Sequence, residues 1–108
     1  MKSTPDFIAE LYYRTKAEGG RSTPVWSKYR PQIKFPFSDM QTSGQQMFID
    51  KETVHPGDTV TAEITIISTE PFRNMLYPGI EFEFREGLRV IGIGKILEIV
   101  NKELLQLA

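Results

Sequence analysis

The residues with the clearest chemical potential lie between positions 12 and 34, where basic and aromatic side chains alternate. Six Lys and Arg residues stand there against a single acid, Glu18. Cationic side chains bind phosphate groups, and aromatic rings or guanidinium planes stack on unpaired bases. The pattern indicates an anion-binding surface that suits RNA; the alternative is a solvated charged loop whose aromatic residues cover one end of the domain. The cations are Arg14, Lys16, Arg21, Lys28, Arg30 and Lys34, and the aromatic residues are Tyr12, Tyr13, Trp26 and Tyr29.

Charge is distributed unevenly along the chain of 108 residues, whose formal net charge is -1 at pH 7. Residues 1–34 hold seven Lys and Arg against three Asp and Glu, a balance of +4. Residues 35–108 hold six against eleven, a balance of -5. This distribution excludes a globally basic nucleic-acid binder but allows one local basic surface in the first third of the chain.

Residue types that support catalysis or metal binding are scarce in the sequence. The chain has no cysteine, which removes disulfides, thiolate ligands and a cysteine nucleophile. Its one histidine, His55, precedes Pro56 in a turn without a neighbouring nucleophile, and a single imidazole makes no multi-histidine metal site. No P-loop motif occurs. We therefore predict a protein that is not an enzyme, with no catalytic residue, no metal site and no cofactor.

Alternating apolar and polar residues, the pattern of half-buried strands, occupy most of the chain. Glu81 and Glu83 then share the solvated face of one strand rather than forming an acid–base pair. Pro36 places its strand at an edge, at a bulge or at a strand end. The predicted strands are residues 7–13, 33–37, 46–49, 61–67, 80–85 and 89–97.

Turn residues separate the predicted strands. Residues 55–58 and 77–80 both place Pro and then Gly at the centre of a type II turn, and residues 18–21 form another tight turn. Gly92 and Gly94 lie within a predicted strand, where they suit a bend or a close backbone approach. Short strands separated in this way predict an antiparallel barrel or sandwich.

The period of the pattern changes near the C-terminus. Leu97, Val100, Leu104 and Leu107 are spaced as one stripe of a helix. We predict a short amphipathic helix or turn over about residues 98–108 that packs on its own barrel. A docking helix for a partner is the alternative.

Length and hydropathy predict one domain over residues 1–108. A chain of this length buries a core without disulfides. No apolar run approaches the ~18 residues that cross a bilayer, and the first residues lack a signal-peptide core. We expect a cytoplasmic protein with no membrane partner.

Four short motifs follow one another along the chain. Residues 18–24 read EGGRSTP, residues 28–32 read KYRPQ, residues 56–58 read PGD, and residues 85–94 read REGLRVIGIG. They resemble E-G-G-R-H-T-P, G-Y-R-P-Q-F, M-P-G-D and R-E-G-G-R-T-V-G-A-G of the C-terminal barrel, the third domain, of bacterial elongation factor Tu. The opening strand is similar to the family's F-E-A-E-V-Y, so the resemblance covers about residues 6–97.

The resemblance implies an all-β fold: a six-stranded antiparallel Greek-key barrel over about residues 6–97, followed by a helical tail. It also implies a non-catalytic role in translation. In the family this barrel contacts the T-stem backbone of aminoacyl-tRNA, packs on companion domains and meets the exchange factor elongation factor Ts. The resemblance does not extend to the GTPase domain, so no bound nucleotide is expected.

The family's T-stem contacts map onto individual residues of this chain. The Arg of G-G-R is Arg21, the Gln of R-P-Q is Gln32, and the Glu-Gly of R-E-G are Glu86 and Gly87. A threonine contact matches Thr42 loosely, because the loop before it is longer here. Together with two cations of the basic segment, the expected RNA-binding residues are Arg21, Lys28, Arg30, Gln32, Thr42, Glu86 and Gly87.

The chain also departs from the family pattern. Glu70 stands where the family has a basic residue or histidine before proline, Leu88 replaces the second glycine of R-E-G-G-R, and Ser22 replaces the histidine of E-G-G-R-H-T-P. Residues 71–79 are longer and more apolar than the family's connection, which predicts an interaction surface or a plug of the barrel end. Besides RNA binding, the chain could be a degenerate domain that needs companion domains, or a protein-interaction barrel that has lost tRNA binding. In the last case its apolar anchors are the C-terminal tail together with Phe72, Met75 and Leu76.

Overall fold

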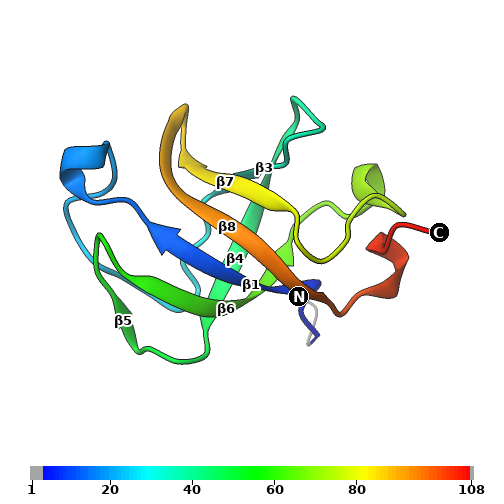
Figure 1. Ribbon diagram of the computed structural model, residues 1–108, viewed down its shortest axis with the longest axis horizontal. Coiled ribbons are helices and arrows are strands. Elements are labelled where there is room, and N and C mark those ends of the chain that lie inside the picture. Colours follow the sequence, from blue (N-terminus) through cyan, green and yellow to red (C-terminus); the bar gives the residue numbers. More distant parts are fainter. Residues whose placement is uncertain (1–3, 108) are drawn as a thin grey trace.

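The computed structural model describes residues 4–107, which form a closed antiparallel β-barrel (Figure 1). Around the barrel the strands follow the order β1-β6-β4-β3-β7-β8. β1 lies beside β6 and β8, while the next strand of the barrel in sequence, β3, lies between β4 and β7. The long connection from β1 to β3 therefore crosses one end of the barrel, as in a Greek key. The expected six-stranded barrel is confirmed in the described residues. Its strands are β1 (Phe7–Tyr13), β3 (Gln32–Lys34), β4 (Gln41–Phe48), β6 (Thr59–Ile66), β7 (Glu81–Glu86) and β8 (Arg89–Ile99).

Smaller elements lie in the connections. β2 (Val25–Trp26) pairs with β5 (Thr53–Val54) as a separate two-stranded sheet. The remaining secondary structure of the described residues consists of three short 3-10 helices: η1 (Lys16–Glu18), η2 (Glu70–Phe72) and η3 (Lys102–Leu104). None of the helices in residues 4–107 has the length and apolar character needed to cross a membrane.

Alternation along the strands divides the side chains between the core and the outer surface. Along β1, Phe7, Ala9, Leu11 and Tyr13 are buried, and the residues between them are half-buried or exposed. Aromatic rings fill much of the interior, and Phe82 packs edge to face on Phe7 with 5.7 Å between ring centroids. The buried positions therefore follow the period of two that predicted the strands.

Two glycines of β8 lie opposite two of the core rings. Gly92 and Gly94 pair across the sheet with Phe84 and Phe82 of β7. A Cβ atom at either glycine would overlap the facing ring. The expected close backbone approach is confirmed at Gly92, where a Cβ atom would also lie 2.6 Å from the Tyr12 carbonyl oxygen. At Gly94 a core ring, and not backbone, occupies the space.

Both Pro-Gly turns form as predicted. The His55 carbonyl accepts a hydrogen bond from the Asp58 amide at 3.0 Å, and the Tyr77 carbonyl accepts one from the Ile80 amide at 3.3 Å. The φ angles of Gly57 and Gly79 are 94° and 101°, in the left-handed region that glycine adopts without strain.

Several strand ends differ from the prediction, most of all in β4, β3 and β8. β4 begins at Gln41, well before the expected residue 46. The prediction missed the first half of this strand because it is polar and shows no apolar alternation. Backbone hydrogen bonds to β3 and β6 hold this half in the sheet, whatever the side chains. β3 ends at Lys34, before Pro36, which cannot donate to a ladder. β8 continues to Ile99, two residues beyond the expected limit.

The connection after β6 and the C-terminal tail close one end of the barrel together. Phe72 packs against Phe35 with 5.1 Å between ring centroids. Leu76 pairs with Leu105 in an isolated parallel bridge, and the Leu76 carbonyl accepts a hydrogen bond from the Gln106 amide at 2.7 Å. These contacts make residues 71–79 a plug of the barrel end, the second of the two alternatives for this segment.

The expected helical turn after the last strand is present as η3, and it packs on its own barrel through the buried Leu104. The leucine stripe, however, does not form one face. Leu97 lies in β8 and is 47% exposed, and Leu107 follows η3 and is 74% exposed. The expected amphipathic helix is reduced to one turn because β8 extends to Ile99 and leaves few residues after it.

Candidate nucleic-acid interface

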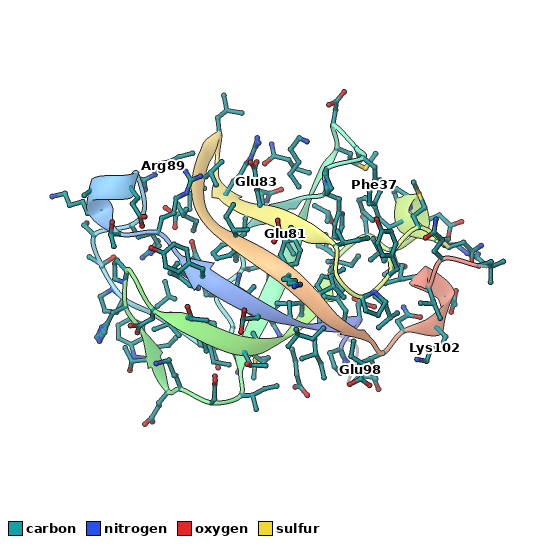
Figure 2. All side chains as sticks on the ribbon, viewed as in Figure 1. Phe37, Glu81, Glu83, Arg89, Glu98 and Lys102 are labelled. Atoms are coloured by element: carbon teal, nitrogen blue, oxygen red, sulfur yellow. The ribbon has the colours of Figure 1, made fainter. Side chains whose placement is uncertain are left out.

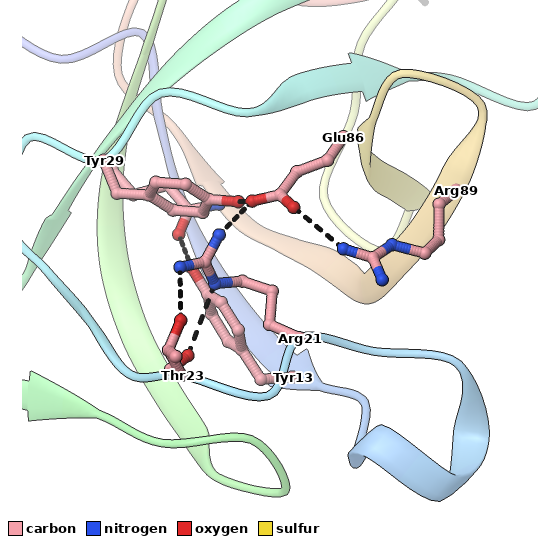
Figure 3. A network of polar contacts seen from close by, with 7 residues as sticks. Tyr13, Arg21, Thr23, Tyr29, Glu86 and Arg89 are labelled. Atoms are coloured by element: carbon pink, nitrogen blue, oxygen red, sulfur yellow. Dashed lines mark hydrogen bonds and ion pairs between the residues drawn. The ribbon is translucent and has the colours of Figure 1, made fainter.

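Arg21 and Glu86 meet at the other end of the barrel, although 65 positions separate them in the sequence (Figure 3). Arg21 lies in the connection between β1 and β2, and Glu86 is the last residue of β7. The Arg21 Nη1 atom donates to Glu86 Oε2, and the two side chains are 21% and 31% exposed. Two of the expected RNA-binding residues are thus partners in one half-buried ion pair.

The turn before Arg21 holds that side chain over the barrel end. Thr15 and Glu18 cap η1 reciprocally, each side chain accepting a hydrogen bond from the backbone amide of the other residue. Gly19 then ends η1 with a φ of 95°. Gly20 is buried so closely against Arg14 that a Cβ atom there would overlap the Arg14 carbonyl. Only glycine at position 20 lets the chain pass close enough to place Arg21 beside Glu86.

Tyr29 and Arg89 complete the network around Glu86. The Arg21 guanidinium lies 5.1 Å from the centroid of the Tyr29 ring, and the Tyr29 hydroxyl donates to Glu86 Oε2 at 2.5 Å. Arg89 Nη2 donates to Glu86 Oε1 at 3.1 Å. Thr23 also accepts from Arg21, with 2.9 Å between Nη2 and Oγ1. One carboxylate therefore organises two guanidinium groups and a phenol at the surface.

The network keeps Glu86 ionised. Its partial burial alone would raise the pKa, but hydrogen bonds from Tyr29 and Arg21 hold the pKa of Glu86 below its usual range. Burial, and then the hydrogen bond to Glu86, raise the pKa of the Tyr29 phenol, so Tyr29 stays a neutral donor. At neutral pH the network is a fixed arrangement of charges.

Replacing Glu86 with glutamine is expected to cost about 1 kcal/mol of stability at pH 7, because two guanidinium groups lose their anionic acceptor. The substitution should also make the free energy of unfolding depend less on pH between pH 7 and pH 3. Since the folded pKa of Glu86 is lowered, its contribution is present above the unfolded pKa, about 4.3, and is lost as pH falls through the folded value. Urea unfolding between pH 7 and pH 3 measures both effects.

The matched control for this prediction is Glu98→Gln, which removes an exposed carboxylate from β8, far from the network (Figure 2). Glu86→Gln should show the smaller fall in unfolding free energy between pH 7 and pH 3. Equal slopes for wild type and Glu86→Gln would show that the Glu86 network does not stabilise the fold.

The aromatic residues of the basic segment differ in their availability. Tyr13 is buried, its hydroxyl donates to Gln46 Oε1, and its ring lies 4.9 Å from the Phe84 centroid. Tyr29 is half-buried under Arg21. Trp26, which is 57% exposed, therefore presents the largest open aromatic face of this segment.

The remaining expected RNA-binding residues occupy different environments. Lys28 and Arg30 are exposed on either side of Tyr29, and Arg30 Nη2 approaches Gln45 Oε1 at 3.3 Å. Gln32 lies on β3, where its amide donates to Ser43 Oγ at 3.0 Å. These residues are accessible from outside the barrel, as the expected contacts require.

Thr42 is an exception and must be removed from the expected surface. Its side chain is 4% exposed, and its hydroxyl oxygen is buried without a hydrogen-bond partner among the described residues. Gly87, in contrast, is exposed in the β7–β8 turn with a φ of 63°. The structure brings Arg21, Glu86 and Gly87 together, leaves Lys28 and Arg30 exposed on either side of Tyr29, and buries Thr42.

Two of the three expected protein-interaction anchors are buried. Phe72 is 1% exposed and Leu76 is 0% exposed, because both belong to the plug. Met75 is 40% exposed and is the only one of the three that a partner could reach in this structure. Phe72 and Leu76 thus fill the barrel end, while Met75 and Tyr77 of the same segment stay exposed.

A groove of about 600 Å³ runs along the outer face of β7. Its charged walls contain two acids and two bases, and Arg85 donates to Glu83 within it. Figure 2 shows Glu81 and Glu83 along this strand. The balanced charge gives the groove no preference for an anion, unlike the surface around Arg21. Among residues 4–107 no group of three His, Cys, Asp or Glu side chains is arranged to hold a metal.

Sequence reasoning did not assign Arg89 to the candidate surface, and although it placed Tyr29 in the basic and aromatic segment, it did not link Tyr29 to Glu86. The signal for Arg89 was available, because Glu86 and Arg89 flank the two central residues of a hairpin turn and so face one another. No comparable local signal links Tyr29 to Glu86, which lies 57 positions away.

A comparison with known protein families places the chain in a family. Residues 1–100 match the family model of the elongation factor Tu C-terminal domain. The match includes every strand of the barrel and every member of the network around Glu86.

Proposed function

The chain belongs to the elongation factor Tu C-terminal domain family, and on this premise we propose that it is a non-catalytic module that binds the backbone of tRNA-like RNA at a T stem. Its fold is that of a translation-factor β-barrel. The proposal extends this family assignment to a ligand, and it names the surface around Arg21, Tyr29 and Glu86 as the contact.

The arrangement of the guanidinium groups carries the proposal. Arg21 and Arg89 converge on Glu86, and the Tyr29 ring fixes the plane of Arg21. A cation held in this way loses little side-chain entropy when it meets a phosphate or a 2′-hydroxyl. A-form RNA is recognised mainly through such backbone contacts and its shape, which requires few contacts to bases.

Charge supports the same surface. Lys28 and Arg30 flank Tyr29, Arg14 Nη1 approaches the Val90 carbonyl at 3.4 Å, and Lys16 lies in η1. The acids of this region include Glu18, which accepts from the Tyr12 hydroxyl at 2.5 Å, Glu86, and Asp58, whose carbonyl accepts from the Tyr13 amide. The cations outnumber the acids, although the whole chain has a net charge of -1. A polyanion would therefore approach this end in preference to the rest of the molecule.

The same contacts argue against catalysis at this surface. A general acid needs a proton to give at working pH, and Glu86 stays ionised because its pKa is lowered. All its described hydrogen bonds are already made to Arg21, Tyr29 and Arg89. The surface is built to hold charge in place, which suits binding.

The test is a titration of labelled protein with purified bulk tRNA at several salt concentrations. With about three phosphate contacts, the logarithm of affinity should fall against the logarithm of salt with a slope of about -2 to -3. Saturable binding with this slope supports the proposal. Absence of saturable binding at low salt would refute it.

The second candidate function, protein binding by the plugged end, keeps one supporting observation. Met75, Tyr77 and Leu107 are 40%, 46% and 74% exposed on segments that the plug brings together. A protein that fails to bind tRNA in the titration above would shift the assignment to this apolar surface.

A further inference from the structure

We infer that the backbone of residues 74–76 is a docking edge for an extended peptide, and that the partner it fits is the tail of a second copy of this chain. In this structure the chain's own tail, residues 101–107, occupies the edge. Two copies that exchange tails would form a dimer by domain swapping. This role goes beyond the proposed function, because it concerns the plugged end of the barrel and does not depend on RNA binding at the other end.

Main-chain hydrogen bonds hold the tail on the edge. The Asn74 amide donates to the Glu103 carbonyl at 3.0 Å, and the Leu76 amide donates to the Leu104 carbonyl at 2.8 Å. In return the Leu76 carbonyl accepts from the Gln106 amide at 2.7 Å, and the two segments run parallel. An extended peptide that adds to the edge of a sheet is held by main-chain bonds of the same kind. The tail therefore binds as a peptide ligand would.

A single buried leucine anchors the tail. Leu104 is 0% exposed and lies in the same core cluster as Phe72 and Leu76 of the plug. Leu105 is half-buried, and Leu107 is 74% exposed. In strand addition the main-chain bonds give affinity, and pockets for individual side chains give specificity. The position of Leu104 therefore defines the peptide that fits, which is an extended segment with a leucine between the main-chain bonds.

The tail can leave the edge while the barrel stays closed. Residues 101–107 follow β8 and contribute no strand to the barrel, and the family match ends at residue 100. Asn101 fixes the point from which the tail would open, because its Nδ2 atom donates to Asp6 Oδ1 at 2.9 Å and its amide donates to the Asp6 carbonyl at 2.9 Å. Ordering the residues that follow costs conformational entropy, which one buried side chain offsets only in part. Segments of this kind open locally, at a free energy well below that of global unfolding.

A second copy supplies a peptide whose fit to this edge the structure already shows. An exchanged tail keeps each of the contacts described above and changes only which molecule provides it. The residues beyond Asn101 span about 20 Å when extended, which is enough to cross from one plugged end to another placed against it. Met75 on the edge and Leu107 on the tail are exposed apolar side chains that would be covered when two such ends meet. The tether gives the chain's own tail a high local concentration, so exchange should increase with protein concentration.

The first experiment measures binding of a fluorescent peptide with the sequence of residues 101–107 to the full chain by fluorescence anisotropy. Leu104→Ser removes the anchor of the resident tail and leaves the 74–76 edge unchanged. We expect this variant to bind the peptide more than about tenfold more tightly than wild type, because its own tail no longer competes. Leu107→Ser, which replaces an exposed leucine of the same tail, is the matched control and should bind as wild type does. A peptide with serine in place of the leucine of position 104 should bind none of these proteins.

Two measurements on wild type test the same inference without a change in the core. Sedimentation of the full chain should show a dimer whose fraction rises with protein concentration and falls when the peptide is added in excess. In hydrogen exchange, the amides of Leu76 and Gln106, which donate across the contact, should exchange at least about tenfold faster than the amides of β1, which is paired on both sides.

Equal peptide affinity of wild type and a folded Leu104→Ser variant would overturn the inference, and so would binding of the peptide that lacks the leucine. If thermal unfolding shows that Leu104→Ser does not fold, the wild-type measurements decide. Exchange of the Leu76 and Gln106 amides at the rate of the β1 amides would overturn it, because the tail would then leave only on global unfolding. Wild type that stays monomeric up to about 1 mM would overturn a second copy as the occupant. The tRNA titration tests the proposed function separately from all of these results.

Discussion

Replacing Arg21 and Arg30 together with alanine is expected to weaken tRNA binding about a hundredfold near 0.1 M salt. It should also reduce the salt slope by about two, because each phosphate contact contributes nearly one to that slope. Arg21 is held in place by Tyr29 and Glu86, and Arg30 is exposed beside Tyr29. The measurement is a tRNA titration of the double variant over a series of salt concentrations.

A charge-matched control separates local contacts from net charge. Arg73→Ala with Lys102→Ala removes the same charge from the plugged end of the barrel, where Arg73 follows η2 and Lys102 lies in η3 (Figure 2). This control should retain nearly all tRNA affinity and the wild-type slope. Equal losses in both double variants would mean that net charge, and not the surface around Arg21, drives binding. A thermal unfolding curve verifies that each variant is folded.

The largest effect on stability is expected for Gly92→Ala, at about 3 kcal/mol. The new methyl group would overlap the Phe84 ring and lie 2.6 Å from the Tyr12 carbonyl oxygen. The ring is part of the packed core, and the carbonyl belongs to the backbone of the neighbouring strand, so neither can move without disturbing β1 or β7. In a domain of this size such a loss lowers Tm by more than about 10 °C.

Urea unfolding at pH 7 measures this loss as a change in midpoint at constant slope. Lys95→Ala, three residues along β8, is the control, because Lys95 is exposed and its substitution should change stability by less than about 0.5 kcal/mol. A loss below about 1 kcal/mol for Gly92→Ala would show that the core accommodates the methyl group and that close packing at this glycine does not limit the barrel.

The sequence was most informative where side chains alternate around a strand. β1 was predicted at its observed limits, residues 7–13, because Phe7, Ala9, Leu11 and Tyr13 alternate with less buried residues along it. Gly92 and Gly94 were expected at a bend or a close backbone approach, and this holds for Gly92, which lies close to the Tyr12 carbonyl, whereas Gly94 faces the Phe82 ring.

β4 shows where this reasoning fails. Its polar first half carries no hydrophobic signal, and Gly44, Gln45 and Gln46 are buried one after another, which breaks the period of two. The face on which Thr42 lies therefore cannot be read from its position, and its burial was not predicted. The prediction that Phe72 and Leu76 bind a partner was wrong for a related reason. An apolar segment has the same sequence pattern whether it binds another protein or fills the end of its own barrel.

The candidate surface was predicted only in part. Its residues come from two separate motifs, and the sequence does not show that these motifs meet. Arg21 and Glu86 were identified through the family resemblance, yet nothing local in the sequence indicates that they pair. That contact depends on the order of strands around the barrel, which brings the β7–β8 turn beside the connection after η1. Tyr29 enters the network for the same non-local reason.

The central claim, that the end of the barrel with Arg21 binds RNA, is tested most directly by mapping amide chemical shifts of ¹⁵N-labelled protein during a tRNA titration. We predict that the perturbed amides are those of residues 14–31 and 86–89, and that residues 70–79 and 100–107 are unaffected. Perturbations confined to residues 70–79 and 100–107, or none at all at low salt, would contradict the claim.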